Sequence, residues 1–346
     1  MEESQHIAVL GGGSFGTAIA KVLAENGFPV RFWMRDPEQV DHIRTRHENP
    51  RYFPGVELST LIEPTTEIGT AISRARLVFV ALPSKVFRTV IHDCAHYFAS
   101  DQMVVSTTKG IERVGFRLMS EVLQEELPGV RVGVLSGPNL AGELVNHELT
   151  ASVIASEHSE VRETVQRILG NEYFRVYANL DVYGVELGGA LKNIYAVVSG
   201  LAAARDMGEN TKSMLITRSL AEMSRFAVSM GANPMTFLGL SGVGDLIVTC
   251  TSSMSRNYRV GYAMGKGATL DEAVAEIGQV AEGVRTLELV HEKALEIGVY
   301  MPLVRGLYEV LYNGASIDDV VSALMKAAQN SDVEFILPRQ GEGAAI

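Results

Sequence analysis

The chain has 346 residues, 47% of them hydrophobic, which is enough to fill two sizeable cores and argues against disorder. Its formal charge of −11 argues against nucleic-acid binding, so any anionic ligand needs a local cationic pocket. There is no signal-peptide profile and no apolar run that approaches a membrane span, so we expect a cytoplasmic protein without a membrane partner. Cys94 and Cys250 stand far apart, and His92 and His96 lack a third ligand, so neither a disulfide framework nor a metal site is expected.

The first predicted element is an apolar strand at residues 6–10 that runs directly into a glycine-rich turn and a helical pattern. Gly11, Gly13 and Gly16 have the spacing Gly-x-Gly-x-x-Gly. In such a turn the first glycine permits the tight bend, the second lets a diphosphate approach the backbone, and the third lets the helix pack on the strand. With a strand before it and a helix after it, this turn predicts a dinucleotide site.

The second predicted strand, residues 30–34, leads to Arg35 and Asp36. In a dinucleotide fold this strand end touches the adenosine ribose, where an arginine favours a 2′-phosphate and an acid favours a free 2′-hydroxyl. Arg35 comes first, so we prefer NADP as the cofactor. Asp36 keeps NAD open, and a solvated surface cation is the competing interpretation of Arg35.

Further apolar runs alternate with helical patterns up to about residue 180. They cover residues 77–82, 103–106, 132–135, 151–155 and 174–176, and several are continuously apolar. Continuous apolar strands are typical of a parallel sheet covered by helices on both faces. We therefore predict a doubly wound α/β domain of the Rossmann type over residues 1–185.

Ligands of such a sheet bind beyond the carboxyl ends of its strands, where three loops are expected. These loops cover residues 82–84, 107–110 and 136–141. Lys109, in the second loop, is a cation placed to contact a phosphate or a carbonyl oxygen. A single lysine in such a loop is more often simply exposed.

From about residue 181 helical patterns follow one another, at residues 184–204, 213–229, 270–277, 284–297 and 316–325. We expect an all-α domain over residues 186–335 and a tail at 336–346. Lys192 and Asn193 lie inside the first of these helices, among apolar neighbours. Desolvation there would lower the pKa of the lysine and suit it to donate a proton near neutral pH. A lysine that snorkels from the helix edge is the alternative.

Two polar clusters follow. Asp245 comes after three glycines within residues 239–244, and its carboxylate would orient a lysine if the two were paired. Ser255, Arg256 and Asn257 stand at an expected helix start, where a guanidinium, an amide and the helix dipole suit a phosphate. Simple capping of the helix by Ser255 is the alternative.

Taken in order, these motifs resemble those of the soluble NAD(P)-dependent sn-glycerol-3-phosphate dehydrogenases of the bacterial type, over about residues 5–330. The family usually has Trp where Phe15 stands, and often Ser or Thr and then Phe where this chain has Asn139-Leu140. The resemblance implies a Rossmann domain and a helical domain, an active site between them, and a homodimer. The matching positions are Gly11-x-Gly13-x-Phe15-Gly16-Thr17-Ala18, Lys109-Gly110, Ser136-Gly137-Pro138, Glu186-Leu187-x5-Lys192-Asn193, Gly242-x2-Asp245-Leu246 and Ser255-Arg256-Asn257.

The resemblance also implies the roles of individual residues. Lys192 would be the general acid and base, and Lys109 and Asp245 would complete the reacting centre. The enzyme would interconvert dihydroxyacetone phosphate and sn-glycerol 3-phosphate by hydride transfer and so supply glycerol phosphate for phospholipid synthesis. The substrate would contact Lys109, Gly137, Asn139, Lys192, Asn193, Asp245, Thr249, Ser255, Arg256 and Asn257. The cofactor, NADP or NAD, would contact Gly11, Gly13, Ser14, Phe15, Gly16, Arg35, Lys109, Ala141, Arg256, Val280 and Glu282.

Two other functions fit part of the same pattern. A two-domain dehydrogenase of another hydroxy acid or of a ketopantoate-like substrate would share the layout, but Arg256 and Asn257 suit a phosphate better. A sensor that binds NAD(P)H without catalysis would not need Lys192 and Asp245 at one site.

Overall fold

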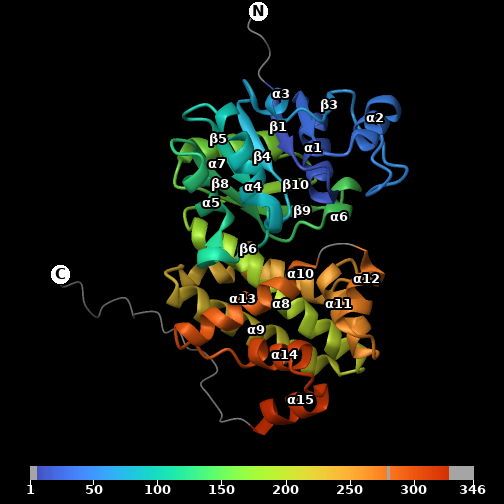
Figure 1. Cartoon of the computed structure of the whole chain (residues 1–346), viewed down its shortest axis with the longest axis vertical. Helices are drawn as coiled ribbons and strands as arrows, with labels where there is room; N and C mark the ends of the chain where they lie inside the picture. The colour runs from blue at the N-terminus through green and yellow to red at the C-terminus, as the bar shows by residue number, and fades with distance from the viewer. Residues whose placement is uncertain (1–5, 279–280, 327–346) are drawn as a thin grey trace, which may run out of the picture.

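The structure, a computed structural model, describes residues 6–278 and 281–326, which form two lobes stacked along the longest axis (Figure 1). The upper lobe contains an eight-stranded sheet with the order β10-β9-β8-β5-β4-β1-β2-β3. The predicted strands are confirmed to within three residues at each end. The strands are β1 (Ile7–Leu10), β2 (Val30–Trp33), β3 (Ile62–Thr65), β4 (Leu77–Val80), β5 (Met103–Ser106), β8 (Arg131–Ser136), β9 (Thr150–Ala155) and β10 (Phe174–Asn179).

Helices cover both faces of this sheet. Successive strand residues point to opposite faces, so both sets of side chains are buried. In β1, Val9 belongs to the core on one side, and Ala8 and Leu10 belong to the core on the other. This two-sided burial explains the continuously apolar strands and confirms the predicted Rossmann-like class. The first side is covered by α1 (Ser14–Glu25), α2 (Pro37–Arg46), α6 (Ala141–Val145) and α7 (Ser159–Leu169), and the second by α3 (Ile68–Ile72), α4 (Ser84–Cys94) and α5 (Met119–Glu126).

Two features of the sheet differ from the sequence prediction. Strand β3 was missed because Glu63 and Pro64 interrupt its apolar pattern; as an edge strand it tolerates the proline. The sheet is not wholly parallel, because β8 and β9 are antiparallel, with Val134 opposite Ala155. A parallel return needs a crossover that spans the sheet, and α6, with 5 residues, is too short to provide it. The loop after β8 therefore stays beyond the carboxyl end of that strand, on the side where ligands of such a sheet bind.

The lower lobe is built from helices around the buried helix α8 (Val182–Ala204) (Figure 1). A Cβ on Gly200 would lie 2.0 Å from Tyr258 O, so α8 and α11 (Arg256–Gly265) touch backbone to backbone.

Two helices of this lobe, α10 (Asp245–Thr251) and α14 (Pro302–Tyr312), were not predicted. Helix α10 is short and rich in β-branched residues, and α14 contains Gly306. The other helices are α9 (Glu209–Ser229), α12 (Leu270–Ile277), α13 (Glu282–Glu296) and α15 (Ile317–Lys326).

Helix α8, the centre of the lower lobe, also packs against the upper lobe. Its first turn places Val185 in a small core with Val134 and Val153 of the sheet, and Glu186 accepts a hydrogen bond from Ser120 N at 3.1 Å. The predicted division between residues 185 and 186 thus falls inside α8 and stays a prediction. The predicted tail, 336–346, lies outside the described residues.

In the described part of the chain, α8 alone is long and apolar enough to cross a membrane, which corrects the expectation that no segment reaches that length. Within the protein, 83% of its most apolar stretch is buried. Its apolar character is therefore that of a core helix.

Candidate active site

The glycine-rich turn after β1 has the geometry that a dinucleotide requires. Gly11 has a φ of +119°, and a Cβ there would lie 2.4 Å from Ala81 O. A Cβ on Gly16 would lie 1.9 Å from Gly11 O, so only glycine lets α1 start against β1. Gly13 faces open space, and among the described residues no side chain caps the first turn of α1. Uncapped N–H groups at an open helix start fit the diphosphate of a nicotinamide dinucleotide.

Three charged side chains from separate elements meet where the lobes face each other. Lys109 follows β5, Lys192 lies on α8, and Asp245 begins α10. Asp245 Oδ2 accepts a hydrogen bond from Lys109 Nζ at 2.9 Å, and Asp245 Oδ1 accepts one from Lys192 Nζ. The Lys192 and Asp245 side chains are 6% and 1% exposed, whereas Lys109 keeps 21%. One carboxylate between two ammonium groups leaves a net positive charge at this place in an acidic protein.

Neighbouring polar groups fix these side chains. Thr249 Oγ1 accepts from Lys192 Nζ at 2.7 Å and donates to the Asp245 carbonyl oxygen at 2.6 Å. Lys109 Nζ also donates to Gly137 O and to Asn139 Oδ1, both at 2.9 Å. The structure thus brings the predicted residues Gly137, Asn139 and Thr249 to the same cluster.

The protonation of Lys192 follows from its surroundings. Burial lowers the pKa of Lys192 to about 7; Asp245 acts in the opposite direction, and Lys109 lowers the value further. The amine and the ammonium forms are therefore both populated near neutral pH, as a proton donor and acceptor requires. The alternative of a snorkelling lysine is wrong, because the side chain points to a buried carboxylate.

The start of α11 carries the predicted anion-binding residues. Ser255 Oγ accepts from Tyr258 N at 3.3 Å, so Ser255 caps the helix. Asn257 Nδ2 donates to Asn193 Oδ1 at 2.9 Å, and Asn257 Oδ1 accepts from Gly283 N at 2.9 Å. Asn257 therefore ties α11 to α8 and α13.

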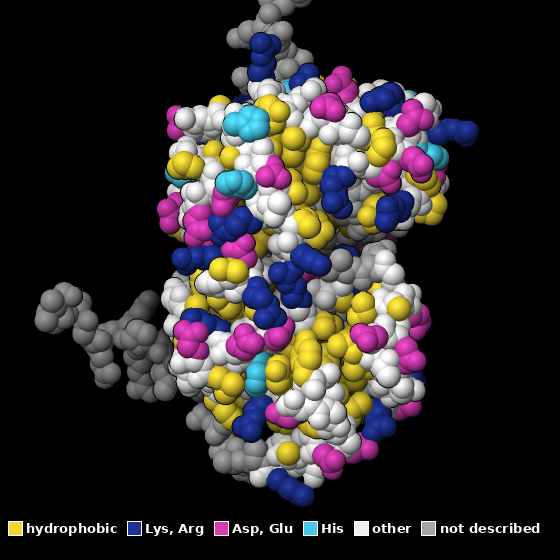
Figure 2. All heavy atoms as spheres, viewed as in Figure 1, with side chains coloured by type: hydrophobic (Ala, Val, Ile, Leu, Met, Phe, Trp, Pro, Cys, Tyr) yellow, Lys and Arg dark blue, Asp and Glu magenta, His cyan; other side chains and the backbone are white. Residues whose placement is uncertain are grey.

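Arg256 lies beside this junction and keeps solvent contact. Partial desolvation lowers its pKa, and the nearby Glu282 and Tyr52 partly offset that effect. Figure 2 shows Lys and Arg side chains gathered at the waist between the lobes. A substrate that carries a phosphate thus meets positive charge in this part of the surface.

The remaining predicted cofactor residues come from both lobes. Ser14 and Phe15 begin α1, Ala141 begins α6, and Arg35 is exposed after β2. Glu282, at the start of α13, accepts hydrogen bonds from Ser84 N at 3.3 Å and from Ser84 Oγ at 2.9 Å. Val280 lies outside the described residues.

Ser84 contacts a predicted cofactor residue, Glu282, in a way that sequence reasoning missed. The loop at 82–84 was expected to face ligands, but nothing in its sequence predicts a contact with a residue 198 positions away. Through this contact Ser84, at the start of α4, and Glu282, at the start of α13, join the two lobes.

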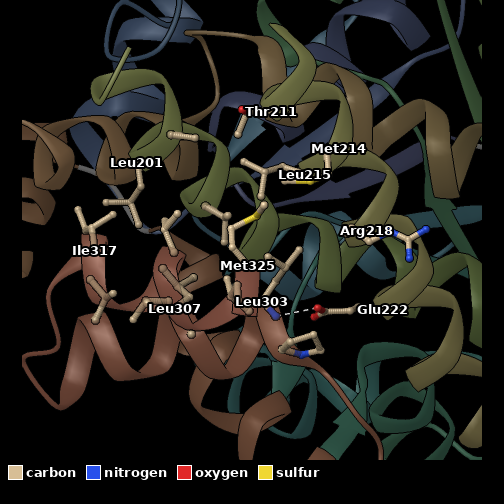
Figure 3. Close-up of a pocket in the computed structure, with 18 of the residues that line it drawn as sticks. Leu201, Thr211, Met214, Leu215, Arg218, Glu222, Leu303, Leu307, Ile317 and Met325 are labelled. Atoms are coloured by element: carbon tan, nitrogen blue, oxygen red, sulfur yellow. Dashed lines mark hydrogen bonds between the residues drawn. The ribbon is translucent and has the colours of Figure 1, made fainter. Parts of the chain in front are cut away.

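A separate apolar pocket of about 290 Å³ lies in the lower lobe among α8, α9, α14 and α15 (Figure 3). Its described lining includes none of the predicted site residues. Glu222, on its wall, accepts from Leu303 N at 2.7 Å, and burial raises the pKa of Glu222 to about 7. Glu222 thus holds the start of α14, and the reacting cluster lies elsewhere.

A Rossmann-like lobe with an open dinucleotide turn, joined to a helical lobe by a helix that carries a buried lysine, defines a two-domain dehydrogenase that uses a nicotinamide cofactor. Comparison with known families shows which dehydrogenase family this is. The N-terminal model of NAD-dependent glycerol-3-phosphate dehydrogenase matches residues 6–162, and the C-terminal model matches residues 181–322. The chain belongs to the NAD-dependent glycerol-3-phosphate dehydrogenase family.

Individual relatives agree. A Pseudomonas aeruginosa (strain LESB58) protein named as an NAD(P)+ glycerol-3-phosphate dehydrogenase is 59% identical over 97% of this chain and 98% of its own length. The glycerol-3-phosphate dehydrogenase of Coxiella burnetii has a crystal structure with a TM-score of 0.89 and 35% identity, covering 93% of this chain and 99% of that one. A ketopantoate reductase from Ralstonia eutropha, at 14% identity and a TM-score of 0.57 over 89% of this chain and 97% of its own, shares the fold alone.

Replacing Asp245 by Asn should destabilise the protein by about 2–4 kcal/mol near pH 7, because it leaves a buried lysine without its counter-charge. The loss should be larger at pH 6 than at pH 8. In the folded parent, Asp245 lets Lys192 take up its proton as the pH falls through about 7. The variant lacks this counter-charge, so protonation of Lys192 favours unfolding more strongly at pH 6 than at pH 8. Urea unfolding at both pH values measures the loss.

Asp318→Asn is the control, since Asp318 pairs with Arg205 but is 78% exposed, and its loss should stay within about 0.5 kcal/mol. Equal, pH-independent losses in the two variants would contradict the electrostatic account of the cluster.

Proposed function

We propose that the protein interconverts dihydroxyacetone phosphate and sn-glycerol 3-phosphate, with NADP preferred over NAD. The observation that carries this proposal is the buried Lys192, paired with Asp245 beside Lys109 at the place where the two lobes meet. The names of the relatives support the same reaction. A protein that only senses NAD(P)H, without catalysis, would need no such cluster. The ketopantoate reductase resembles this chain in fold only.

The substrate's phosphate is proposed to bind at the start of α11. Arg256 offers a guanidinium fork, and the amide of Asn257 and the first turn of the helix add donors. Ser255 and Asn193 support these groups by capping α11 and by pairing with Asn257. Binding energy at this unreactive end holds the carbonyl group at the lysines.

The proton is handled by the cluster. In the reducing direction, the ammonium of Lys192 donates a proton to the carbonyl oxygen as negative charge grows there. Lys109 adds a second positive charge, and Asp245, with Thr249, Gly137 and Asn139, keeps both nitrogens in place. In the oxidising direction, the neutral amine of Lys192 accepts the hydroxyl proton.

When bound, the cofactor exchanges a hydride with the central carbon of the substrate. Its diphosphate would be held by Gly11, Gly13 and Gly16 and the first turn of α1. The rest of its path would be lined by Ser14, Phe15, Arg35, Lys109, Ala141, Arg256 and Glu282. Val280, which the resemblance also implies, lies outside the described residues.

In the cell, we place this activity in the cytoplasm, in a homodimer without membrane or nucleic-acid partners. Its product would supply the glycerol phosphate of phospholipids.

The assay of this function is the oxidation of NADPH with dihydroxyacetone phosphate, compared with dihydroxyacetone and with ketopantoate. Only the phosphorylated ketone should be reduced efficiently. Arg256→Ala should raise the KM for dihydroxyacetone phosphate about 10–100-fold, because a charge-assisted fork is lost.

Arg259→Ala removes the same charge from an exposed position one turn further along α11 and serves as the control, with an expected KM within about 2-fold of the parent. Efficient reduction of a phosphate-free ketone, or equal KM values in the two variants, would overturn the assignment.

The two directions of the reaction should depend on pH in opposite ways. Reduction needs the ammonium form of Lys192, so its kcat/KM should fall as the pH rises from 7 to 9. Oxidation needs the amine, so its kcat/KM should rise over that range from an apparent pKa of about 7. The substrate phosphate is already dianionic there and adds little slope. Parallel profiles in both directions would rule out a proton exchanged with Lys192.

A further inference from the structure

Asp36, the acid that keeps NAD open in the sequence, is already engaged in the structure. Its Oδ1 accepts from Glu38 N at 3.0 Å and from Gln39 N at 3.5 Å, so it caps α2. Its Oδ2 lies 3.8 Å from Arg51 Nη1. A carboxylate that caps a helix and faces a guanidinium is poorly available as an acceptor for the ribose hydroxyls.

Arg51 reaches Asp36 because a buried network holds the turn at residues 49–53. Asn49 is 1% exposed, and its Nδ2 donates to Thr17 Oγ1 of α1 at 2.7 Å. Gln39 Nε2 donates to Gly12 O at 2.6 Å and to Asn49 Oδ1 at 3.1 Å. The turn that carries Arg51 is therefore fastened to the glycine-rich turn itself.

Two arginines consequently stand at the end of β2. Arg35 is exposed there, and the Arg51 side chain is 68% exposed, with its guanidinium 5.9 Å from the centre of the Tyr52 ring. Asn49, at the start of this turn, also donates through Nδ2 to Gly12 O at 3.4 Å. The turn therefore lies beside the glycine-rich turn at which the dinucleotide is proposed to bind.

We propose that Arg51 is a second cofactor-selecting residue, which binds the 2′-phosphate of NADP together with Arg35, while Asp36 binds no part of the ribose. Two guanidinium groups complement a phosphate dianion, and the contact with Arg51 offsets the repulsion that Asp36 would otherwise exert. This proposal rests on the proposed function only in requiring a nicotinamide dinucleotide at the glycine-rich turn.

The test is binding without substrate, followed through the fluorescence of the reduced cofactors in the whole protein. Arg51→Ala and Arg35→Ala should each weaken NADPH about 10-fold and leave the Kd for NADH within about 2-fold. Arg46→Ala, at the other end of α2, removes the same formal charge and should leave the ratio of the two Kd values unchanged. The proposal is overturned if Arg51→Ala behaves like Arg46→Ala or weakens both cofactors equally.

Asp36→Asn separates the two roles of the carboxylate, because Asn also caps helices well. Removing the negative charge should tighten NADPH and leave NADH unchanged. A loss of NADH affinity would show that Asp36 binds the ribose, against the proposal. Since no ketone is present, these outcomes are independent of which substrate is reduced. Failure of dihydroxyacetone phosphate reduction with normal NADPH selectivity would overturn only the proposed function, and a parent that binds neither cofactor would overturn both.

Discussion

The contact on which the rest of the structure depends is that of one buried carboxylate with two ammonium groups. Asp245 lies between Lys109 and Lys192, and each of the three comes from a different part of the chain. Burying an unpaired charge is costly, so the cluster is stable only when the loop after β5, helix α8 and helix α10 are all in place. The same burial brings the pKa of Lys192 to about 7. The three side chains that the fold must bring together are thus the ones that we propose for proton transfer.

Glycines allow these elements to approach so closely. A Cβ on Gly189 would lie 2.6 Å from Ser136 Oγ, and one on Gly188 would lie 2.8 Å from Ser241 O. Both glycines precede Lys192 on α8, so the helix can lie directly against the end of β8 and the segment before α10. Close packing of the backbone therefore fixes the position of Lys192. A lysine on a flexible surface segment would not be held in this way.

Much of this could be predicted from the sequence, because periodic apolar patterns and the glycine spacing are local signals. Continuous apolar runs predicted the central strands, and an apolar helix with a lysine in it predicted α8. Pairings between distant segments leave no such signal. The antiparallel β9, the contact of Ser84 with Glu282 and the fastening of Arg51 through Asn49 depend on loop lengths and tertiary packing. The residues alone indicated that Asp245 would orient a lysine if the two were paired, and the family resemblance implied that Lys192 belongs to the same centre. The burial of the pair is a result of the fold.

The central claim is that Lys192 transfers the proton. The most direct measurement is a single turnover of NADPH and dihydroxyacetone phosphate on Lys192→Ala, with the Kd for NADPH measured on the same preparation. The account predicts that NADPH binds with a Kd close to that of the parent while its oxidation slows by at least about 100-fold. Oxidation at close to the parent's rate, with NADPH bound normally, would contradict the account.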